Sequence, residues 1–198
     1  DDYQDCVRHS TKQGQNQFLA VRALARFMLQ NSLNISSRQI QISRHKSGRP
    51  IIAVDGQNSD IEISFSHSRN HVGVAITTLG KIGIDVEFAH KVRDFRNMFG
   101  QIYADISDID EFCDDRETGY QIWTSFESFY KASGRHPSTG FLAQQQNSDA
   151  DSINLIDGHI VGRTHHEKIF KSFTLLCDIL AKDEPFRSCW PTPIPADY

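Results

Sequence analysis

Two carboxylates near the middle of the chain stand at a spacing that could hold a metal ion. Apolar and polar residues alternate in KIGIDVEF (81–88), so in a strand Asp85 and Glu87 would project from the same face, about 7 Å apart. Neighbouring like charges repel, and a hard divalent cation such as Mg²⁺ would relieve that repulsion. A half-buried strand that exposes its charges to water has the same pattern, so this stretch leaves both interpretations open.

A second group of chemically capable residues lies in WTSFESFYKASG (123–134). Trp123, Glu127 and Lys131 are four residues apart, which places them on one side of a helix, facing the same neighbour. A Glu four residues before a Lys is also an ordinary surface ion pair, which stabilises a helix by only ~0.2–0.5 kcal/mol. If this helix packs across the strand at 81–88, Glu127 supplies a third carboxylate for a metal ion.

Hydroxyl, imidazole and guanidinium groups suited to phosphate occur in the first half of the chain. SFSHS (64–68) ends a strand with Ser66 and His67, whose side chains and nearby backbone N–H groups can donate to phosphate oxygens. Further cations that could meet phosphates are Arg49, in SGRP, and the helix residues Arg22 and Arg26. A polar strand end is the plainer interpretation of SFSHS. The chain has no P-loop and no G-x-G-x-x-G, which excludes the ordinary nucleotide-binding motifs.

The elements that must position these residues follow from hydrophobic periodicity. NQFLAVRALARFMLQ predicts a helix over 16–30, with an apolar side formed by Leu19, Ala23, Leu24, Phe27 and Met28. Short strands separated by turn residues are expected at 51–54, 61–68, 72–77 and 81–88. Helical periodicity returns over 91–122 and leads into the helix at 123–133. A hairpin over 153–163, a buried strand over 171–180 and a proline-rich extended tail over 190–198 complete the pattern.

Composition limits the classes of function. With 198 residues, 38% hydrophobic and 23% charged, the chain is a globular protein with one core or two small ones. A net charge of −4 gives no reason to expect binding to nucleic acid, and no apolar run is long enough to span a membrane. Its four cysteines form no C-x-x-C pair, which suits a reducing compartment, and we expect a cytoplasmic protein.

Taken in order, SGRP, SFSHS, GIDVE and WTSFESFYKASG resemble the motifs of the phosphopantetheinyl transferases. In that family a G-(K/R)-P turn and an F-x-x-S-H-S strand precede G-(I/V)-D-(I/V)-E and W-(T/S)-x-K-E-(S/A)-x-x-K. The length resembles the larger, surfactin-type branch. The resemblance implies an α+β fold in which two similar α/β lobes form an intramolecular pseudo-dimer, here 1–83 as the coenzyme A-binding lobe and 84–198 as the metal-binding and catalytic lobe.

The resemblance also implies a reaction, the transfer of the 4′-phosphopantetheine arm of coenzyme A to a serine of an apo carrier protein, with release of 3′,5′-ADP. The implied ligands of Mg²⁺, or of Mn²⁺, are Asp85, Glu87 and Glu127. The implied catalytic residues are Glu127 as the base for the serine proton, Lys131 beside the diphosphate, and His67. The residues implied to bind coenzyme A are Arg22, Arg26, Arg49, Pro50, Ser66, His67 and Lys131.

The implied partner is an acyl or peptidyl carrier protein of fatty acid, polyketide or nonribosomal peptide biosynthesis, and a monomer is expected. Carrier proteins are acidic around the acceptor serine, so the predicted docking surface is HKVRDFRNMF (90–99), with the cations Lys91, Arg93 and Arg96 and aromatic residues that are expected to be exposed. A solvated helix face is the alternative interpretation of that segment.

One position departs from the family pattern. Phe126 stands where the family has a lysine, and the loss of a cation beside a diphosphate would cost on the order of 1.5–3 kcal/mol of binding. A second hypothesis is therefore a non-catalytic homologue that binds coenzyme A or a carrier protein without turnover. A third is a metal-dependent phosphohydrolase that uses the same acidic cluster.

Overall fold

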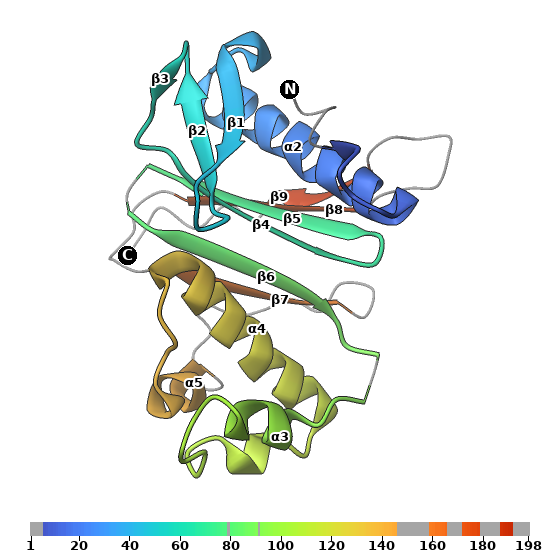
Figure 1. Ribbon diagram of the computed structural model, residues 1–198, viewed down its shortest axis with the longest axis vertical. Coiled ribbons are helices and arrows are strands. Elements are labelled where there is room, and N and C mark those ends of the chain that lie inside the picture. The colour runs from blue at the N-terminus through green and yellow to red at the C-terminus, as the bar shows by residue number, and fades with distance from the viewer. Residues whose placement is uncertain are drawn as a thin grey trace.

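The computed structural model describes residues 6–78, 80–90, 92–145, 159–165, 172–178 and 187–191. It shows the mixed α+β fold predicted from the sequence. Figure 1 shows strands through the middle of the molecule, with helix α2 on one side of them and helix α4 on the other. This arrangement, a helix packed on antiparallel strands in each half, agrees with the predicted fold class, whereas the similarity of two lobes remains a prediction.

The N-terminal half is built around helix α2 (Lys12–Leu33). Its start is capped by Thr11, whose side chain accepts a hydrogen bond from the backbone N–H of Gly14, so the helix begins earlier than predicted. Leu24 and Met28 face the core as expected. The rest of the predicted apolar side is wrong: Leu19 is 42% exposed, Phe27 is 55% exposed, and Ala23 is exposed too. The side that packs on the strands is instead formed by Phe18, Val21, Leu24, Ala25, Met28 and Leu29.

Two sheets accompany this helix. One is a small meander of β1 (Ile40–Arg44), β2 (Pro50–Val54) and β3 (Gln57–Asn58), and β1 was not predicted from the sequence. The other is an antiparallel sheet in the order β4-β5-β8-β9, formed by β4 (Glu62–Ser68), β5 (His71–Thr77), β8 (Ser172–Asp178) and β9 (Arg187–Pro191). Strand β5 is buried along its whole length, because α2 packs on one face of it and β6 on the other.

The second half centres on β6 (Ile82–Phe88), which pairs antiparallel with β7 (His159–His165). Helix α4 (Arg116–Ser133) packs on both strands. The region predicted as helical over 91–122 consists of α3 (Phe95–Gly100), a 3₁₀ turn (Asp110–Phe112) and the start of α4. A short helix, α5 (Thr139–Gln145), follows α4. Helix α4 is capped by Asp115, whose side chain accepts from Thr118 N–H, and ends at Gly134, which takes the left-handed conformation (φ 73°).

Strand β6 alternates as predicted but is not half-exposed. Ile82, Ile84 and Val86 form an apolar cluster with Ala75, while Gly83 and Asp85 on the other face are buried under α4. A Cβ atom at Gly83 would lie 1.8 Å from the carbonyl oxygen of Ser128 in that helix. Only glycine permits so close an approach of helix and strand. The interpretation of the acidic strand as a water-exposed surface is therefore wrong.

A row of serine side chains joins β6 to β4. The backbone N–H groups of alternate β6 residues donate to serine hydroxyls at 2.9–3.1 Å, in the pairs Ile84 to Ser64, Val86 to Ser66 and Phe88 to Ser68. Because β7 is the only described strand that pairs with β6, these hydroxyls accept from N–H groups that have no backbone acceptor among the described residues. The serines of SFSHS thus connect the two halves of the fold.

The C-terminal strands return to the first half, since β8 pairs with β5 and β9 with β8. The predicted boundary between residues 83 and 84 falls inside β6, and the division into 1–83 and 84–198 remains a prediction. Of the predicted hairpin, 159–163 lie in β7 and 153–158 lie outside the described residues. Of the predicted tail, residues 190 and 191 end β9, while 192–198 also lie outside them. Over the described residues, none of the helices has the length and apolar character to cross a membrane.

The close contact at Gly83 predicts a specific loss of stability. Gly83→Ala would force α4 away from β6 and should lower the free energy of unfolding by about 1–3 kcal/mol or more, measured by urea denaturation. The control is Gly100→Ala at the end of α3, where an added Cβ would meet no atom within 4 Å. Equal stability of the two variants would contradict the close packing of helix on strand.

Candidate active site

A pocket of about 540 Å³ lies where α2, the β1–β2 turn, β4 and the end of α4 meet. It gathers most of the residues predicted to bind a phosphorylated ligand, namely Arg22, Arg49, Pro50, His67 and Lys131. Ser66 and Arg26 are not among its lining residues. Lining residues that the sequence analysis did not predict include His9, Phe18, Arg44, Ser47 and Tyr130.

The inner wall of the pocket carries cations held against an aromatic ring. The guanidinium of Arg22, which is 2% exposed, lies 3.6 Å from the ring centroid of Phe18, and that of Arg44 lies 6.0 Å from it. An Arg over an aromatic face is held in place while its charge remains available. Arg44 could have been suspected from the sequence, because it directly precedes the HKSGRP turn that carries Arg49.

Arg49 ties the turn of the first half to the end of α4. Its guanidinium donates to the carbonyl oxygen of Ala132 at 3.3 Å and to the carboxylate of Glu62 at 3.1 Å. Glu62 is also paired with Lys81. Arg49 therefore holds the wall of the pocket together as well as contributing charge to it.

His67 stands on the pocket wall with an imidazole that favours its neutral form. Although the residue is exposed at the surface, desolvation of the ring lowers its pKa below the usual value, and the nearby Lys131 ammonium lowers that pKa further. A neutral imidazole at pH 7 can donate one hydrogen bond to an anionic group and gains a proton readily when an anion approaches.

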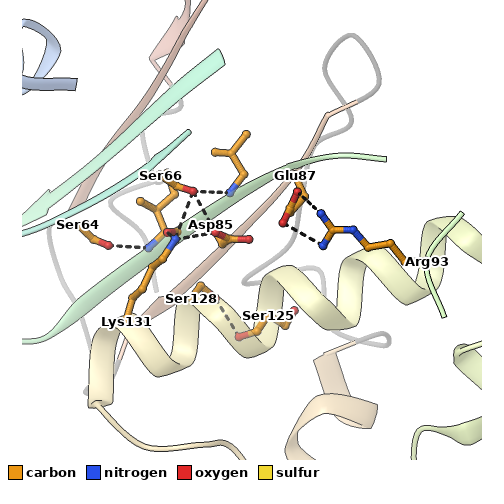
Figure 2. Close-up of polar contacts among 10 residues, drawn as sticks. Ser64, Ser66, Asp85, Glu87, Arg93, Ser125, Ser128 and Lys131 are labelled. Atoms are coloured by element: carbon orange, nitrogen blue, oxygen red, sulfur yellow. Dashed lines mark hydrogen bonds and ion pairs between the residues drawn. The ribbon is translucent and has the colours of Figure 1, made fainter. Parts of the chain in front are cut away.

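Lys131 lies at the junction of this pocket and a group of carboxylates. Its ammonium donates to Asp85 Oδ1 at 2.6 Å and to the carbonyl oxygen of Ile84 at 3.1 Å. Figure 2 shows Lys131 reaching from α4 to the strand that carries Asp85. Because Lys131 also lines the pocket, one cation serves both the acidic strand and any ligand in the pocket.

Ser66 is placed differently from its predicted role. The residue is only 6% exposed, and its hydroxyl donates to Asp85 Oδ1 at 3.0 Å while accepting from Val86 N–H and from Lys131. Figure 2 shows it between β4 and β6, beside Asp85. The structure therefore places Ser66 within the fold, where it orients Asp85, and does not bring it to the pocket wall.

Glu87 faces the same side of β6 as Asp85 and is paired with a different cation. The guanidinium of Arg93 donates to both carboxylate oxygens of Glu87, each at 3.2 Å (Figure 2). Burial raises the pKa of Glu87, the charge of Asp85 raises it further, and Arg93 opposes both effects. The predicted pair of neighbouring carboxylates on one face is present.

Glu127 projects from α4 toward these two carboxylates. Burial raises the pKa of Glu127, and the charge of Asp85 raises it further against the opposing effect of Lys131; Glu87 adds a smaller increase. The three carboxylates thus lie close enough to act on one another electrostatically. Trp123, Glu127 and Lys131 share one side of α4, as predicted, and this side faces Glu87 and Asp85.

The fit of a metal ion to these carboxylates can be tested on their contacts. Within the described ranges, no group of three or more His, Cys, Asp or Glu side chains stands close enough together to hold an ion. Asp85 Oδ2, however, is buried without a hydrogen-bond partner in the described part of the chain. A buried carboxylate oxygen without a donor is costly, and a cation would satisfy it. The carboxylates of Asp85, Glu87 and Glu127 are the type of oxygen donor that Mg²⁺ prefers, but Lys131 and Arg93 hold two of them in ion pairs.

Phe126, the departure from the family pattern, belongs to the core. It is 4% exposed and its ring contacts a set of aromatic side chains at centroid distances of 5.3–6.3 Å, namely Phe99, Tyr103, Trp123 and His136. Its side chain therefore packs among these aromatic rings and does not enter the group of carboxylates. The absent lysine leaves no gap in the structure.

The structure contradicts one premise of the predicted docking surface over 90–99, the exposure of its aromatic residues. Phe95 and Phe99 are 1% and 0% exposed, so its aromatic residues form core and not surface. Arg93 is paired with Glu87, and Arg96 with Asp110 and Asp114. Lys91 lies outside the described residues, and Val92 is exposed. Two of the three expected cations are thus already balanced by carboxylates of the same chain.

Comparisons with known proteins find similarity to 4′-phosphopantetheinyl transferases. The family profile described as "4′-phosphopantetheinyl transferase, N-terminal" matches residues 1–79. A putative 4′-phosphopantetheinyl transferase of Synechocystis sp. is 26% identical over 137 residues, 67% of this chain and 55% of the relative. The human L-aminoadipate-semialdehyde dehydrogenase-phosphopantetheinyl transferase is 25% identical over 74% of this chain and 50% of its own length. For the 4′-phosphopantetheinyl transferase HetI of Nostoc sp., the identity is 24% over 59% of this chain and 51% of the relative. The chain spans about half the length of these curated relatives.

The packing of Phe126 predicts that the family's lysine cannot simply be restored. Phe126→Lys would bury a charge among aromatic rings and should lower the free energy of unfolding by about 3–5 kcal/mol in urea denaturation. Tyr130→Lys is the matched control, because Tyr130 is 44% exposed on the same helix and should change stability little. A Phe126→Lys protein as stable as the control would show that this position accepts a cation.

Proposed function

We propose, starting from the chain's relationship to the 4′-phosphopantetheinyl transferase superfamily, that it transfers the 4′-phosphopantetheine arm of coenzyme A to a serine of an apo carrier protein. The observation that carries this proposal is a pocket lined by Arg22, Arg44, Arg49, His67 and Lys131 that shares Lys131 with a group of carboxylates. Coenzyme A carries a diphosphate and a 3′-phosphate, so a cationic pocket beside an acidic cluster suits it.

In the proposed reaction the serine oxygen forms a bond to the phosphorus that bears the pantetheine arm. The bond between that phosphorus and the bridging oxygen of the diphosphate breaks, and 3′,5′-ADP leaves. Glu127 accepts the serine proton, for which its raised pKa suits it better than that of an exposed carboxylate. Lys131 offsets the charge that develops on the departing phosphate.

Asp85, Glu87 and Glu127 are the proposed ligands of Mg²⁺ or Mn²⁺. When bound, the ion would neutralise the diphosphate and polarise its oxygens. The contribution of the chain itself is to orient Asp85. The Ser66 hydroxyl and the Lys131 ammonium hold Oδ1, and Oδ2 has no hydrogen-bond partner among the described residues. In the ligand-bound protein, Lys131 is free to turn from Asp85 to a phosphate because its side chain also lines the pocket.

The finer features of this proposal are the surfactin-type branch, an acyl or peptidyl carrier as acceptor, a cytoplasmic location and a monomeric state. The second candidate, a non-catalytic binding homologue, rested on Phe126. Phe126 is buried in the aromatic core, where a catalytic protein and a non-catalytic one would both lack a charge. Its presence therefore gives little support to the non-catalytic homologue.

Transfer is tested with purified protein, coenzyme A, Mg²⁺ and several apo carrier proteins, with the carrier mass as the readout. We expect the mass of one phosphopantetheine to be added, and Glu127→Gln and Asp85→Asn each to reduce the rate at least 10²-fold. Glu117→Gln, an exposed carboxylate in the first turn of α4, should leave the rate unchanged.

Two other results of this assay would contradict the proposal. Release of phosphate from coenzyme A without any acceptor would indicate a phosphohydrolase. Binding of coenzyme A without transfer to any carrier would indicate the non-catalytic homologue.

The lowered pKa of His67 predicts that coenzyme A binding takes up a proton in mildly acidic solution. In the free protein, desolvation and then Lys131 lower the pKa of His67, so in mildly acidic solution its ring carries less charge than that of an unperturbed His. Bound phosphates favour the charged form and raise the pKa again. Calorimetry in buffers of different ionisation enthalpy measures the uptake.

His67→Gln should abolish this proton uptake. His45→Gln, which changes an exposed histidine outside the pocket, should retain it. An uptake that persists in His67→Gln would assign the proton to another group.

A further inference from the structure

An exposed aromatic ring stands at the edge of the pocket and has no role in the proposed reaction. Tyr130 is 44% exposed and lines the pocket, one residue before Lys131 on α4. Among the described residues, Tyr130 and Phe27 are the two aromatic side chains in the group of large exposed hydrophobics, and Phe27 does not line the pocket. A single exposed apolar side chain is common, so the surroundings of Tyr130 decide what its ring can do.

The ring of Tyr130 is held by a row of rings that begins in the core. The imidazole of His136 lies 5.4 Å from the ring of Tyr130 and 5.3 Å from that of Phe126, measured between ring centroids. Phe126 is itself fixed among the buried aromatic side chains. Because His136 contacts both rings, the exposed ring is tied to the core and its orientation is restricted. Phe126, which stands where the family has a lysine, thus supports the edge of the pocket through His136.

The part of the pocket beside Tyr130 has open space and small lining residues. Arg49 donates to a carbonyl oxygen near the end of α4 at 3.3 Å, which brings the β1–β2 turn against that helix. The lining residues that these two segments supply include Gly48, Pro50 and Gly134. A Cβ atom added at either glycine would meet no atom within 4 Å. A flat ring could therefore lie there without meeting a side chain of these glycines.

The inner wall of the pocket differs in chemistry from this part. The guanidinium groups of Arg22 and Arg44 lie 3.6 and 6.0 Å from the ring centroid of Phe18, and their charge suits phosphate groups. Beside Tyr130, the cations Arg49 and Lys131 are each paired with a carboxylate in the protein without ligand. The pocket thus offers charge for phosphates and an aromatic ring for a planar group, and a nucleotide presents both.

Tyr130 also lies close to the group that meets the diphosphate in the proposed function. Lys131 is the next residue of α4 and lines the same pocket. In coenzyme A the adenine is joined to one end of the diphosphate through a ribose, and the pantetheine arm is joined to the other end. The adenine matches the ring better, because a planar base stacks on it whereas a flexible arm loses conformational freedom on binding.

We propose that Tyr130, held in place by His136, stacks on the adenine base of coenzyme A. This inference rests on coenzyme A as the ligand of the proposed function, but it depends neither on catalysis nor on a metal ion. Stacking of a base on an aromatic side chain changes affinity on the order of tenfold. Tyr130 thus strengthens binding of the nucleotide half of the ligand without touching the reacting phosphorus.

The test measures the affinity for three ligands by titration calorimetry. These are coenzyme A, 3′,5′-ADP, which keeps the base and lacks the arm, and 4′-phosphopantetheine, which keeps the arm and lacks the base. Tyr130→Ala should weaken the binding of coenzyme A and of 3′,5′-ADP on the order of tenfold each and leave that of 4′-phosphopantetheine unchanged. Tyr130→Phe keeps the ring and should bind all three ligands as the unmodified protein does.

The matched control is Phe27→Ala, which removes an exposed aromatic ring of α2 that does not line the pocket. It should leave all three affinities unchanged. Because Phe27 and Tyr130 are both exposed, neither substitution creates a cavity in the core, and urea denaturation of each variant verifies that it is folded.

His136 is tested as a positioning residue. His136→Ala removes the contact that holds the ring of Tyr130 and should weaken both nucleotides by a smaller factor than Tyr130→Ala does. Combined with Tyr130→Ala, it should have no further effect, because no ring remains to be held. A merely structural effect of His136 would persist in the double variant, so additive losses would overturn its positioning role.

Three results would overturn the proposal. They are unchanged nucleotide affinities in Tyr130→Ala, equal losses in Tyr130→Ala and Phe27→Ala, and a loss for coenzyme A without one for 3′,5′-ADP. The last result would place the ring against the pantetheine arm. An unmodified protein that binds neither nucleotide would overturn both this inference and the proposed ligand. The expected losses in a protein that transfers nothing to any carrier would support the inference and overturn only the proposed reaction.

Discussion

The site depends on how closely α4 approaches β6. The backbone of the helix at Ser128 lies against the strand at Gly83, where any side chain would collide with a carbonyl oxygen. This contact sets the register between helix and strand, so that Trp123 and Glu127 lie over the acidic residues and Lys131 reaches Asp85. Gly83, which has no side chain, therefore determines which charged side chains lie together. The proposed catalytic role depends on this arrangement.

The pairing of charges in the cluster is as informative as their proximity. Each of the two β6 carboxylates has its own cation, Asp85 with Lys131 and Glu87 with Arg93. Burial without such partners would be costly, so the protein without ligand stabilises its acidic cluster by internal ion pairs. Lys131 also lines the pocket, whereas Arg93 is not among its lining residues. The ion pairs thus offset enough negative charge for the cluster to be buried in the folded protein. Lys131 can still leave Asp85 for a ligand in the pocket.

Much of the site could be predicted from the sequence, because alternation in KIGIDVEF and the four-residue spacing of Trp123, Glu127 and Lys131 fix the direction of each side chain relative to its own element. The burial of β6 on both faces was not predictable, since it depends on a helix that follows much later in the chain. The exposed side of α2 was mistaken for its core side because Leu19 and Phe27 fit the helical spacing as well as the buried residues do. The roles of Ser66, Phe126 and Arg93 depend on contacts with other elements, which local patterns do not encode.

The serine hydroxyls between β4 and β6 have a consequence for solubility. A strand whose N–H groups point outward along one edge is a template on which a strand of another molecule can pair, the first step of edge-to-edge aggregation. Ser64, Ser66 and Ser68 occupy these donors along β6. The β6–β7 ribbon is thereby closed to intermolecular pairing on this side by side chains of β4, without a backbone ladder between β4 and β6.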